Sequence, residues 1–213
     1  MKSYRILLAD DHTIVIEGLR RILEPHFQIV GEVHDGTALV AEARQLKPDL
    51  IVADISMPLL NGIDAARQIR KFDRKAKIVF LTMHPDVTYA AEALLAGGSA
   101  YVLKSSAGAE LLVAIYEAFR GLIYVTPCID GALVRIQMES AASLPGIRPE
   151  LSRRQREVLQ LLAEGKSLKE IAATLNLSVR TAEFHKYQIM KLLGIRSNAE
   201  LTKHAVKLGI TPL

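Results

Sequence analysis

Short apolar runs alternate with segments of helical periodicity through the first half of the chain. Four of these runs cover residues 6–9, 50–53, 78–81 and 101–103. Because consecutive residues in each run are apolar, the runs are typical of strands buried on both faces of a parallel sheet. Parallel strands need helical crossovers between them, so the pattern restricts this part of the chain to an α/β fold.

A fifth strand and five helices complete the predicted alternation. We expect the additional strand over Gln28–Val33 and the helices over residues 13–23, 36–46, 61–71, 87–96 and 108–119. The predicted fold class is therefore a doubly wound, five-stranded parallel sheet with the flavodoxin-like strand order 2-1-3-4-5 and helices on both faces.

Periodicity weakens after residue 120, where Gly, Pro, Ser and Ala accumulate. We predict a first domain over residues 1–120, a linker with a short helix over residues 121–147, and a second domain over residues 148–213. The short helix is expected within residues 122–138, and residues 140–146 are the clearest linker sequence.

The second domain is predicted to be all-α, with four helices. Capping boxes of the S-x-x-E/Q type mark three helix starts, near residues 153, 168 and 198, and a fourth helix is expected over residues 179–193. Gly165, Asn176 and Gly194 stand where helices should end. Only residues 176–178 separate the second and third helices, which is the short connection of a helix-turn-helix.

The two predicted domains differ in charge. Residues 1–147 carry 15 Lys/Arg and 17 Asp/Glu, a net charge of −2, whereas residues 148–213 carry 12 and 6, a net charge of +6. The basic excess favours a nucleic-acid surface, although it also suits an ordinary solvated domain. No apolar stretch reaches the roughly 20 residues of a membrane span, so we expect a cytoplasmic protein with no membrane partner. The single Cys128 cannot form an internal disulfide and is expected to be a packing residue.

Residues able to bind phosphate or a metal ion follow four of the apolar runs. They are Asp10 with Asp11, Asp54, Thr82 and Lys104. Ligands of open α/β sheets bind beyond the carboxyl ends of the strands, so we expect these side chains to converge there. Carboxylates are ligands that Mg²⁺ prefers, and a hydroxyl and an ammonium suit phosphoryl oxygens. The set predicts a magnesium-dependent phosphoryl site with Asp54 as the nucleophile.

Each of these residues has an ordinary structural explanation when it is taken alone. An aspartate after a strand caps a helix or forms a turn, a lysine there is a solvated loop residue, and a threonine is a strand-end hydroxyl. The functional interpretation depends on their joint occurrence at four strand ends.

The first domain resembles the receiver domain of two-component response regulators over about residues 3–120. The resembling motifs are residues 6–12, 49–58, 61–62, 79–82 and 97–104. The resemblance implies that Asp54 accepts a phosphoryl group from a sensor histidine kinase and that Thr82 and Lys104 hold this group. It also implies that Tyr101 is a switch aromatic whose inward or outward position follows Thr82.

The same resemblance implies a set of Mg²⁺ ligands. They are Asp10, Asp11, Asp54 and the backbone carbonyl of Ser56.

Two positions depart from the receiver pattern. Receivers often have Pro after the lysine, whereas this chain has Ser105; small residues commonly follow their threonine, whereas this chain has Met83 and His84. We hypothesise that Ser56 and His84 control water access, and hence the lifetime of the aspartyl phosphate, because they flank the expected path of attack.

The predicted helix over residues 179–193 has two different faces. The stripe expected to face the core is Ala182, His185, Ile189, Leu192 and Leu193. The opposite stripe is Arg180, Glu183, Phe184, Tyr187, Gln188 and Lys191. Its cationic, hydrogen-bonding and aromatic groups suit the base edges and phosphates of a major groove. A merely solvated face is the alternative, but two exposed aromatics beside basic residues favour a partner surface.

The second domain resembles the LuxR-type helix-turn-helix, so the whole chain resembles a NarL/FixJ-type response regulator. The motifs are residues 151–159, 165–172, 177–185 and 191–195. The resemblance implies double-stranded DNA as a partner and base contacts from Glu183, Phe184 and Tyr187. The predicted phosphate contacts are Lys169, Arg180, Thr181, Lys186 and Lys191. Many relatives have Lys where Glu183 stands, so the target sequence does not transfer from them.

The last predicted helix, over residues 198–208, has an apolar stripe of Ala199, Leu201, Ala205 and Leu208. By resemblance this helix pairs two output domains, so that a homodimer reads two half-sites on DNA. Packing within one domain explains the stripe equally well.

Together these features predict a phosphorylation-activated, DNA-binding transcription regulator, not an enzyme with turnover. Its only chemistry is self-catalysed phosphorylation and dephosphorylation at Asp54, which shift a two-state receiver and control DNA binding and dimerisation. An Asp-nucleophile phosphatase is the enzymatic alternative, but it needs a second Asp two residues after the nucleophile, where this chain has Ser56. A third interpretation is a phosphate-independent dimerisation module with constitutive DNA binding.

Overall fold

The computed structural model describes residues 4–129, 131, 134, 135, 139, 151–208, 210 and 211. Contacts divide the chain into two compact units, residues 1–143 and residues 144–213, and each is described by itself. This division falls within the segment that we predicted as a linker. The linker sequence 140–146 lies outside the described residues, as do residues 130, 132–133 and 136–138 of the predicted short helix.

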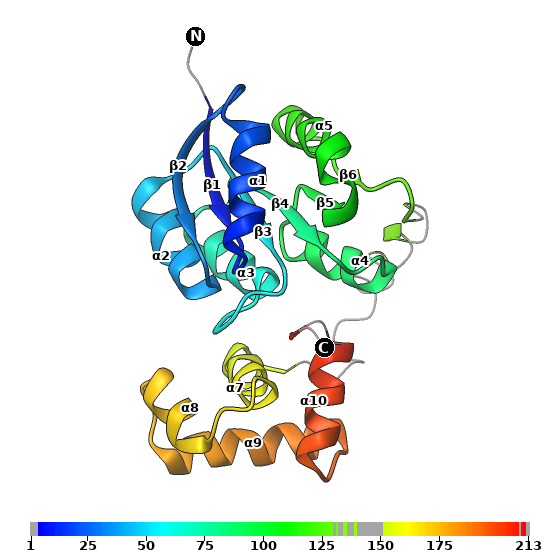
Figure 1. The fold of residues 1–213 in the computed structure, drawn as a ribbon. Helices are drawn as coiled ribbons and strands as arrows, with labels where there is room; N and C mark the ends of the chain where they lie inside the picture. The colour runs from blue at the N-terminus through cyan, green and yellow to red at the C-terminus, as the bar shows by residue number, and fades with distance from the viewer. Residues whose placement is uncertain are drawn as a thin grey trace. The chain divides into compact units, whose positions relative to one another are not determined.

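A parallel sheet forms the centre of the first unit (Figure 1). Its strands are β1 (Arg5–Ala9), β2 (Gln28–Val33), β3 (Leu50–Asp54), β4 (Lys77–Thr82), β5 (Ala100–Leu103) and β6 (Tyr124–Val125). Each neighbouring pair within the described residues is parallel, and the order is β2-β1-β3-β4-β5-β6. The predicted doubly wound fold and its order 2-1-3-4-5 are confirmed.

The described sheet has one strand more than the five we predicted. Strand β6 pairs with β5 through Ala100 with Tyr124 and Tyr101 with Val125. The backbone N–H of Thr126 then donates to the carbonyl of Tyr101 at 2.9 Å. A strand of two residues has no periodicity to detect, so the sequence pattern missed it.

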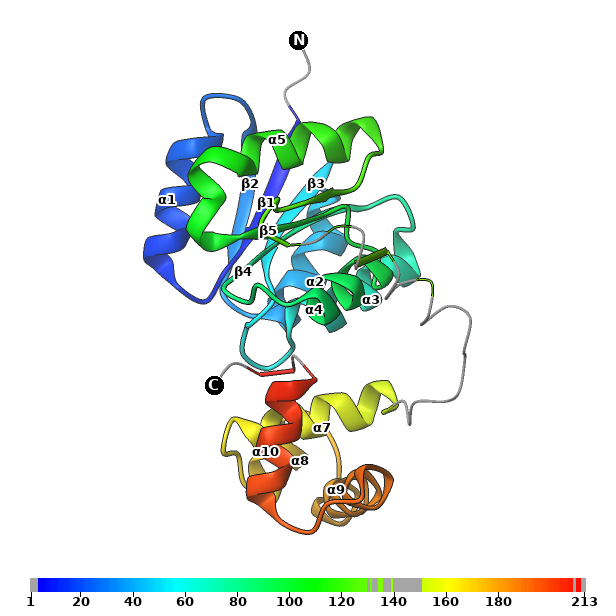
Figure 2. The same cartoon turned by 90° about the vertical axis from the view of Figure 1, so that its right-hand side faces the viewer.

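Within the described residues, five helices cover the two faces of the sheet. They are α1 (Thr13–Leu23), α2 (Gly36–Leu46), α3 (Gly62–Phe72), α4 (Val87–Leu95) and α5 (Ala107–Arg120). Helices α2, α3 and α4 pack on one face, where Leu39, Ile63 and Ala91 belong to one hydrophobic core (Figure 2). Helices α1 and α5 pack on the other face, where Ile16 and Leu111 belong to a second core (Figure 2). Both faces of the strands are therefore buried, which explains their continuous apolar sequences.

The second unit consists of helices α7 (Arg153–Ala163), α8 (Leu168–Thr174), α9 (Val179–Leu193) and α10 (Asn198–Lys207). Ser152 and Ser167 each form a reciprocal capping box, as predicted. Ser197 caps α10, but the Glu200 carboxylate accepts from the backbone N–H of Arg196, so this box is not reciprocal. Positive φ angles confirm the predicted helix ends: φ is 81° at Gly165, 52° at Asn176 and 67° at Gly194.

Two expectations about exposure were wrong, and one open alternative is now favoured. Leu192 is 40% exposed, so it lies outside the buried stripe of α9. For the apolar stripe of α10, Leu201 and Ala205 are buried within the unit while Ala199 is exposed, which favours the alternative of packing within one domain. Cys128 is exposed, because it lies in the turn after the edge strand β6 and not under a helix. No helix within the described ranges is long and apolar enough to cross a bilayer.

Candidate functional site

Acidic and basic side chains from three strand ends meet at one edge of the sheet. Asp10 directly follows β1, Asp54 ends β3, and Lys104 directly follows β5. The Lys104 ammonium lies 2.7 Å from Asp10 Oδ2 and 2.9 Å from Asp54 Oδ2. After Lys104 the chain enters a short 3₁₀ turn, η1 (Lys104–Ser106), and then α5. The structure thus brings Lys104 to carboxylates that lie 50 or more positions earlier in the sequence.

Burial sets the electrostatics of this cluster. Asp10 is fully buried, Asp54 is 3% exposed, and the Lys104 side chain is 14% exposed. Burial raises the pKa of Asp54 above its usual value, and the facing Lys104 ammonium only partly opposes that shift. Burial lowers the pKa of Lys104, but the carboxylates of Asp54 and Asp10 together outweigh it and raise this pKa overall. The lysine therefore stays charged and holds two carboxylates in a desolvated site.

The cluster offers suitable donors to a divalent cation. One potential ligand atom from each of Asp10, Asp11, His12 and Asp54 lies within 4.8 Å of the others. Asp10 Oδ2 is buried without a hydrogen bond of good geometry, although the Lys104 ammonium is close to it. Hard carboxylate oxygens suit Mg²⁺, so the donor set fits this ion.

Two histidines that sequence reasoning did not assign to the site contact its aspartates. His12 Nδ1 lies 2.8 Å from Asp11 Oδ1, and its backbone N–H donates to Asp10 Oδ1 at 2.9 Å. A ring nitrogen of His34 lies 3.0 Å from the backbone carbonyl of Asp10. The position of His12 directly after the two aspartates was the available signal; the approach of His34 depends on how the β2–α2 turn folds.

The loop after Asp54 is held by close backbone contacts. Gly62, the first residue of α3, donates its N–H to the Ile55 carbonyl at 2.8 Å. A Cβ atom built on Gly62 would lie 2.1 Å from the Asp54 carbonyl oxygen, so only glycine fits there. Leu59 has a φ of 65°, and Leu60 donates its N–H across it to Pro58 at 2.7 Å. These contacts fix the segment that includes Ser56, whose backbone N–H hydrogen-bonds Asp54.

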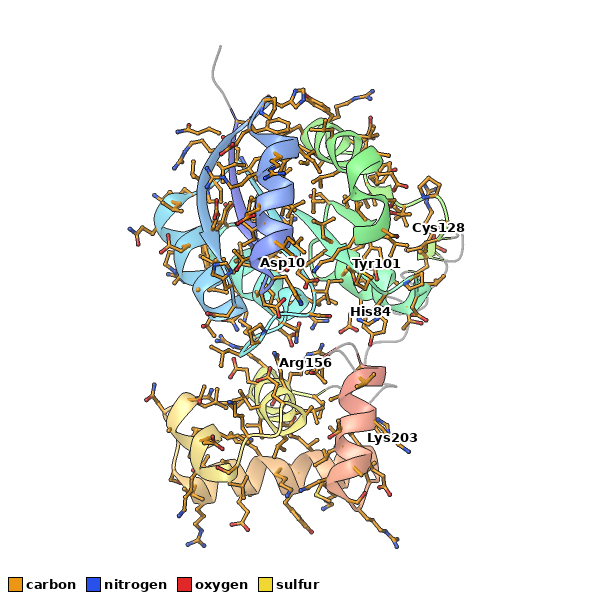
Figure 3. The ribbon with its side chains drawn as sticks, in the orientation of Figure 1. Asp10, His84, Tyr101, Cys128, Arg156 and Lys203 are labelled. Atoms are coloured by element: carbon orange, nitrogen blue, oxygen red, sulfur yellow. The ribbon has the colours of Figure 1, made fainter. Side chains whose placement is uncertain are left out.

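Thr82, His84 and Tyr101 form a hydrogen-bonded chain. Figure 3 labels His84 and Tyr101 in the first unit. The buried Thr82 hydroxyl accepts from the backbone N–H of His84 at 3.1 Å, and the Tyr101 hydroxyl donates to the His84 carbonyl at 2.7 Å. Tyr101 is fully buried, which raises the pKa of its hydroxyl. The His84 ring stacks on Tyr89 at a centroid distance of 5.1 Å. Tyr101 is therefore in the inward position, and both polar groups of the His84 backbone are engaged.

In the second unit, α9 presents the predicted outward residues to solvent except Gln188, which is half-buried. Phe184 is 57% and Tyr187 is 63% exposed. The remaining exposed candidates are Lys169, Arg180, Glu183 and Lys191. Lys186 is half-buried, and the half-buried Thr181 shares a hydrogen bond with the Ser178 hydroxyl at 2.8 Å. Ser178 also caps α9 by accepting from the Thr181 N–H at 3.0 Å.

A buried carboxylate connects α7 to the turn between α8 and α9. Glu157 is 8% exposed and lies 2.9 Å from Arg153 Nε and 2.7 Å from an Arg154 guanidinium nitrogen. The other terminal nitrogen of Arg154 donates to the carbonyl of Leu175, the last residue before Asn176. Sequence reasoning missed this brace, although the i,i+3 and i,i+4 spacing of opposite charges in α7 was visible.

Each unit matches a known protein family. The "Response regulator receiver domain" family matches residues 6–116, and the "Bacterial regulatory proteins, luxR family" matches residues 149–205. The chain is 33% identical over 208 residues to "Transcriptional regulatory protein MctR" of Rhizobium johnstonii, covering 97% of this chain and 94% of that protein.

Solved structures of one DNA-binding relative are also similar to this chain. RcsB of Salmonella enterica serovar Typhimurium, bound to promoter P1flhDC in the presence of the phosphomimetic BeF₃⁻, is 28% identical, with a TM-score of 0.62 and full coverage of both chains. A structure described as two RcsB dimers bound to two parallel DNAs is 29% identical, with a TM-score of 0.56, and the match covers 95% of this chain and 97% of that chain.

Proposed function

The chain belongs to the response regulators that join a receiver domain to a LuxR-family DNA-binding domain, and from that premise we propose that phosphorylation of Asp54 controls its DNA binding. The protein is a DNA-binding transcription regulator. The contact of the Lys104 ammonium with both Asp54 and Asp10 carries the proposal for the receiver. It provides a nucleophile, a cation and a second carboxylate in one buried site.

In the proposed reaction, an oxygen of Asp54 attacks the phosphoryl group of a sensor histidine kinase, and the bond to the donor breaks as the aspartyl phosphate forms. Lys104 leaves its contact with the Asp54 carboxylate and pairs with a phosphoryl oxygen. The Thr82 hydroxyl donates to another phosphoryl oxygen. Lys104 and Thr82 both act on the one phosphoryl group that Asp54 carries. The chemistry is therefore self-phosphorylation and self-dephosphorylation at Asp54.

We propose that Asp10, Asp11, Asp54 and the backbone carbonyl of Ser56 hold Mg²⁺ in this site. The 4.8 Å grouping of the aspartate oxygens and the poorly hydrogen-bonded Asp10 Oδ2 support this assignment. When bound, Mg²⁺ supplies positive charge that offsets the carboxylates and the phosphoryl oxygens.

The switch that we propose passes from Thr82 to Tyr101 through the backbone of His84. When the Thr82 hydroxyl turns toward a phosphoryl oxygen, it gives up its hydrogen bond from the His84 N–H. The His84 backbone can then shift, and with it the carbonyl that accepts from the Tyr101 hydroxyl. The receiver then favours one of two states, and its output changes. His84 and Ser56 flank the path of water, so we expect His84→Ala to alter the lifetime of the aspartyl phosphate by a few-fold; an unchanged rate of dephosphorylation would contradict that role.

For the output unit we propose that α9 enters the major groove. Glu183, Phe184 and Tyr187 would meet bases, and their exposure supports this assignment. The proposed phosphate contacts are Lys169, Arg180, Thr181, Lys186 and Lys191. The RcsB dimers on DNA support a homodimer as the bound form. Because its target is the chromosome, we place the protein in the cytoplasm.

The test compares DNA affinity before and after phosphorylation of full-length protein. A duplex selected from a randomised pool is titrated by fluorescence anisotropy with wild type and Asp54→Asn, each with and without acetyl phosphate and Mg²⁺. We expect acetyl phosphate to increase the affinity of wild type and to leave Asp54→Asn unchanged. Asp73→Asn, at the end of α3, is the matched control and should respond as wild type does. An equal response of Asp54→Asn and wild type would refute the mechanism.

A further inference from the structure

The outermost stripe of α9 has two aromatic rings between two cations. Arg180, Phe184, Tyr187 and Lys191 are separated by four, three and four residues, so they lie along one line of the helix surface. All four are exposed. Among the described residues, neither of the two cations has an ion pair. The stripe is therefore free to meet one anionic partner with an apolar centre.

The dimensions of this stripe match a major groove. Arg180 and Lys191 are about 16 Å apart along the helix axis. The major groove of B-DNA is about 12 Å wide, and its phosphates lie along both edges. With long side chains, the two cations reach phosphates at opposite edges while the helix lies in the groove. Phe184 and Tyr187, at the middle of the stripe, then face the floor of the groove.

The chemistry of the groove floor selects what the rings can contact. Phenylalanine has no hydrogen-bonding group, and tyrosine has one only at the tip of its ring. The base edges in the major groove present donors and acceptors, and thymine adds the single apolar group, its 5-methyl. We propose that Phe184 and Tyr187 read thymine methyl groups, so that each operator half-site has a thymine where each ring meets the bases. This inference rests on the proposed insertion of α9 into the major groove and names what it recognises there.

The charge of Glu183 favours base edges over phosphates at the middle of α9. This residue is exposed and adjacent to Phe184 on the helix, and its carboxylate repels phosphates. The middle of α9 is therefore suited to base edges, whereas Arg180 and Lys191 at the ends are suited to the backbone.

Deoxyuridine substitution tests the proposal because it removes only the thymine methyl and keeps base pairing. Full-length protein selects duplexes from a randomised pool, and each thymine of the selected half-site is then replaced singly by deoxyuridine. We expect one or two positions to weaken binding by about fourfold each, as the loss of one buried methyl implies. Affinities are measured by fluorescence anisotropy at fixed salt.

Variants assign each methyl to a ring. Phe184→Ala should abolish the effect of deoxyuridine at one position, and Tyr187→Ala should abolish it at another. Tyr187→Phe keeps the ring and should keep the sensitivity. Lys191→Ala is the contrasting control. It should weaken binding to the thymine and deoxyuridine duplexes equally, and it should reduce the slope of log affinity against log salt concentration by about 1, the value for one phosphate contact.

Two results would overturn the inference. In the first, no thymine of the selected duplex is sensitive to loss of its methyl; in the second, the sensitivity persists in both alanine variants. Thermal unfolding checks that these variants fold, which their exposed positions lead us to expect. If selection enriches no duplex at all, the proposed DNA reading by α9 fails as well, so the two failures are distinguishable.

Discussion

The two units place their functional side chains in opposite environments. In the first unit, Asp10 and Asp54 are buried, and Lys104 lies between them with little exposure. In the second unit, Phe184 and Tyr187 are more than half exposed. Buried charges are costly unless they are paired, whereas exposed side chains away from special features affect stability little. With the functions that we propose, the receiver therefore couples its chemistry to its own folding, whereas the output unit keeps recognition and folding separate.

Removing Lys104 should give the largest effect and is the strongest test of that coupling. In the absence of divalent metal, we expect Lys104→Met to lower the free energy of unfolding by about 3 kcal/mol, because two buried carboxylates lose their counter-charge. Urea unfolding in a chelating buffer measures this loss. Lys71→Met, at an exposed lysine of α3, should stay within about 0.5 kcal/mol of wild type. If both variants lose the same small amount of unfolding free energy, the receiver does not couple its buried site to its folding.

A methyl group at Gly62 should give the next largest effect. Its Cβ would lie 2.1 Å from the Asp54 carbonyl oxygen, so we expect Gly62→Ala to destabilise the first unit by about 2 to 3 kcal/mol. Gly18→Ala in α1 is the matched control, since its Cβ meets nothing within 4 Å and alanine favours a helix by up to about 1 kcal/mol. The melting temperature should therefore fall for Gly62→Ala and rise for Gly18→Ala. A stable Gly62→Ala protein would show that the loop after Asp54 is less constrained than its contacts indicate.

The second unit should depend on the caps of its helices more than on its functional face. Ser178→Ala removes the cap of α9 and is expected to cost about 1 kcal/mol. Ser178→Asn, which keeps a capping acceptor, should retain most of the stability. Phe184→Ala should unfold within about 0.5 kcal/mol of wild type, because its ring is exposed. Urea unfolding monitored by circular dichroism measures the unfolding free energy of each variant. A larger loss of this free energy for Phe184→Ala than for Ser178→Ala would show that the functional face contributes to folding.

The smallest expected effect is a dependence of stability on pH. The pKa of Asp54 in the folded protein lies above its usual 3.8 because the residue is buried. Between these two pKa values the folded state binds more protons than the unfolded state, so stability falls as the pH rises through this window. Asp54→Asn should remove this fall in metal-free protein. Melting temperatures of both proteins across the acid range check the sign, and an opposite slope would mean that Lys104 overcompensates for the burial of Asp54.

The sheet and its functional edge could be predicted because buried parallel strands leave a continuous apolar signal. Asp54 and Thr82 are the last residues of β3 and β4, and the convergence of their strands follows from the topology. The C-terminal ends of helices α8 and α9 were also predictable, because Asn and Gly favour the positive φ angles that Asn176 and Gly194 adopt there.

Contacts that depend on how loops approach one another were not predictable. The two-residue strand β6 is too short to show a period, and the approach of His34 to Asp10 depends on a turn between separate elements. Arg154 contacts Leu175 across 21 positions of sequence, and only the packing of α7 beside α8 brings them together. The exposure of Leu192 shows the same limit, because a helical projection does not reveal how far a neighbouring helix extends.

The exposed aromatic pair of α9 has an evolutionary consequence. If these two rings read bases as we propose, substitutions in two codons would redirect the protein to other promoters while the fold and the proposed switch are inherited unchanged, because Phe184 and Tyr187 contribute little to the core. After a gene duplication, one copy can therefore acquire a new set of target genes without passing through an unstable intermediate.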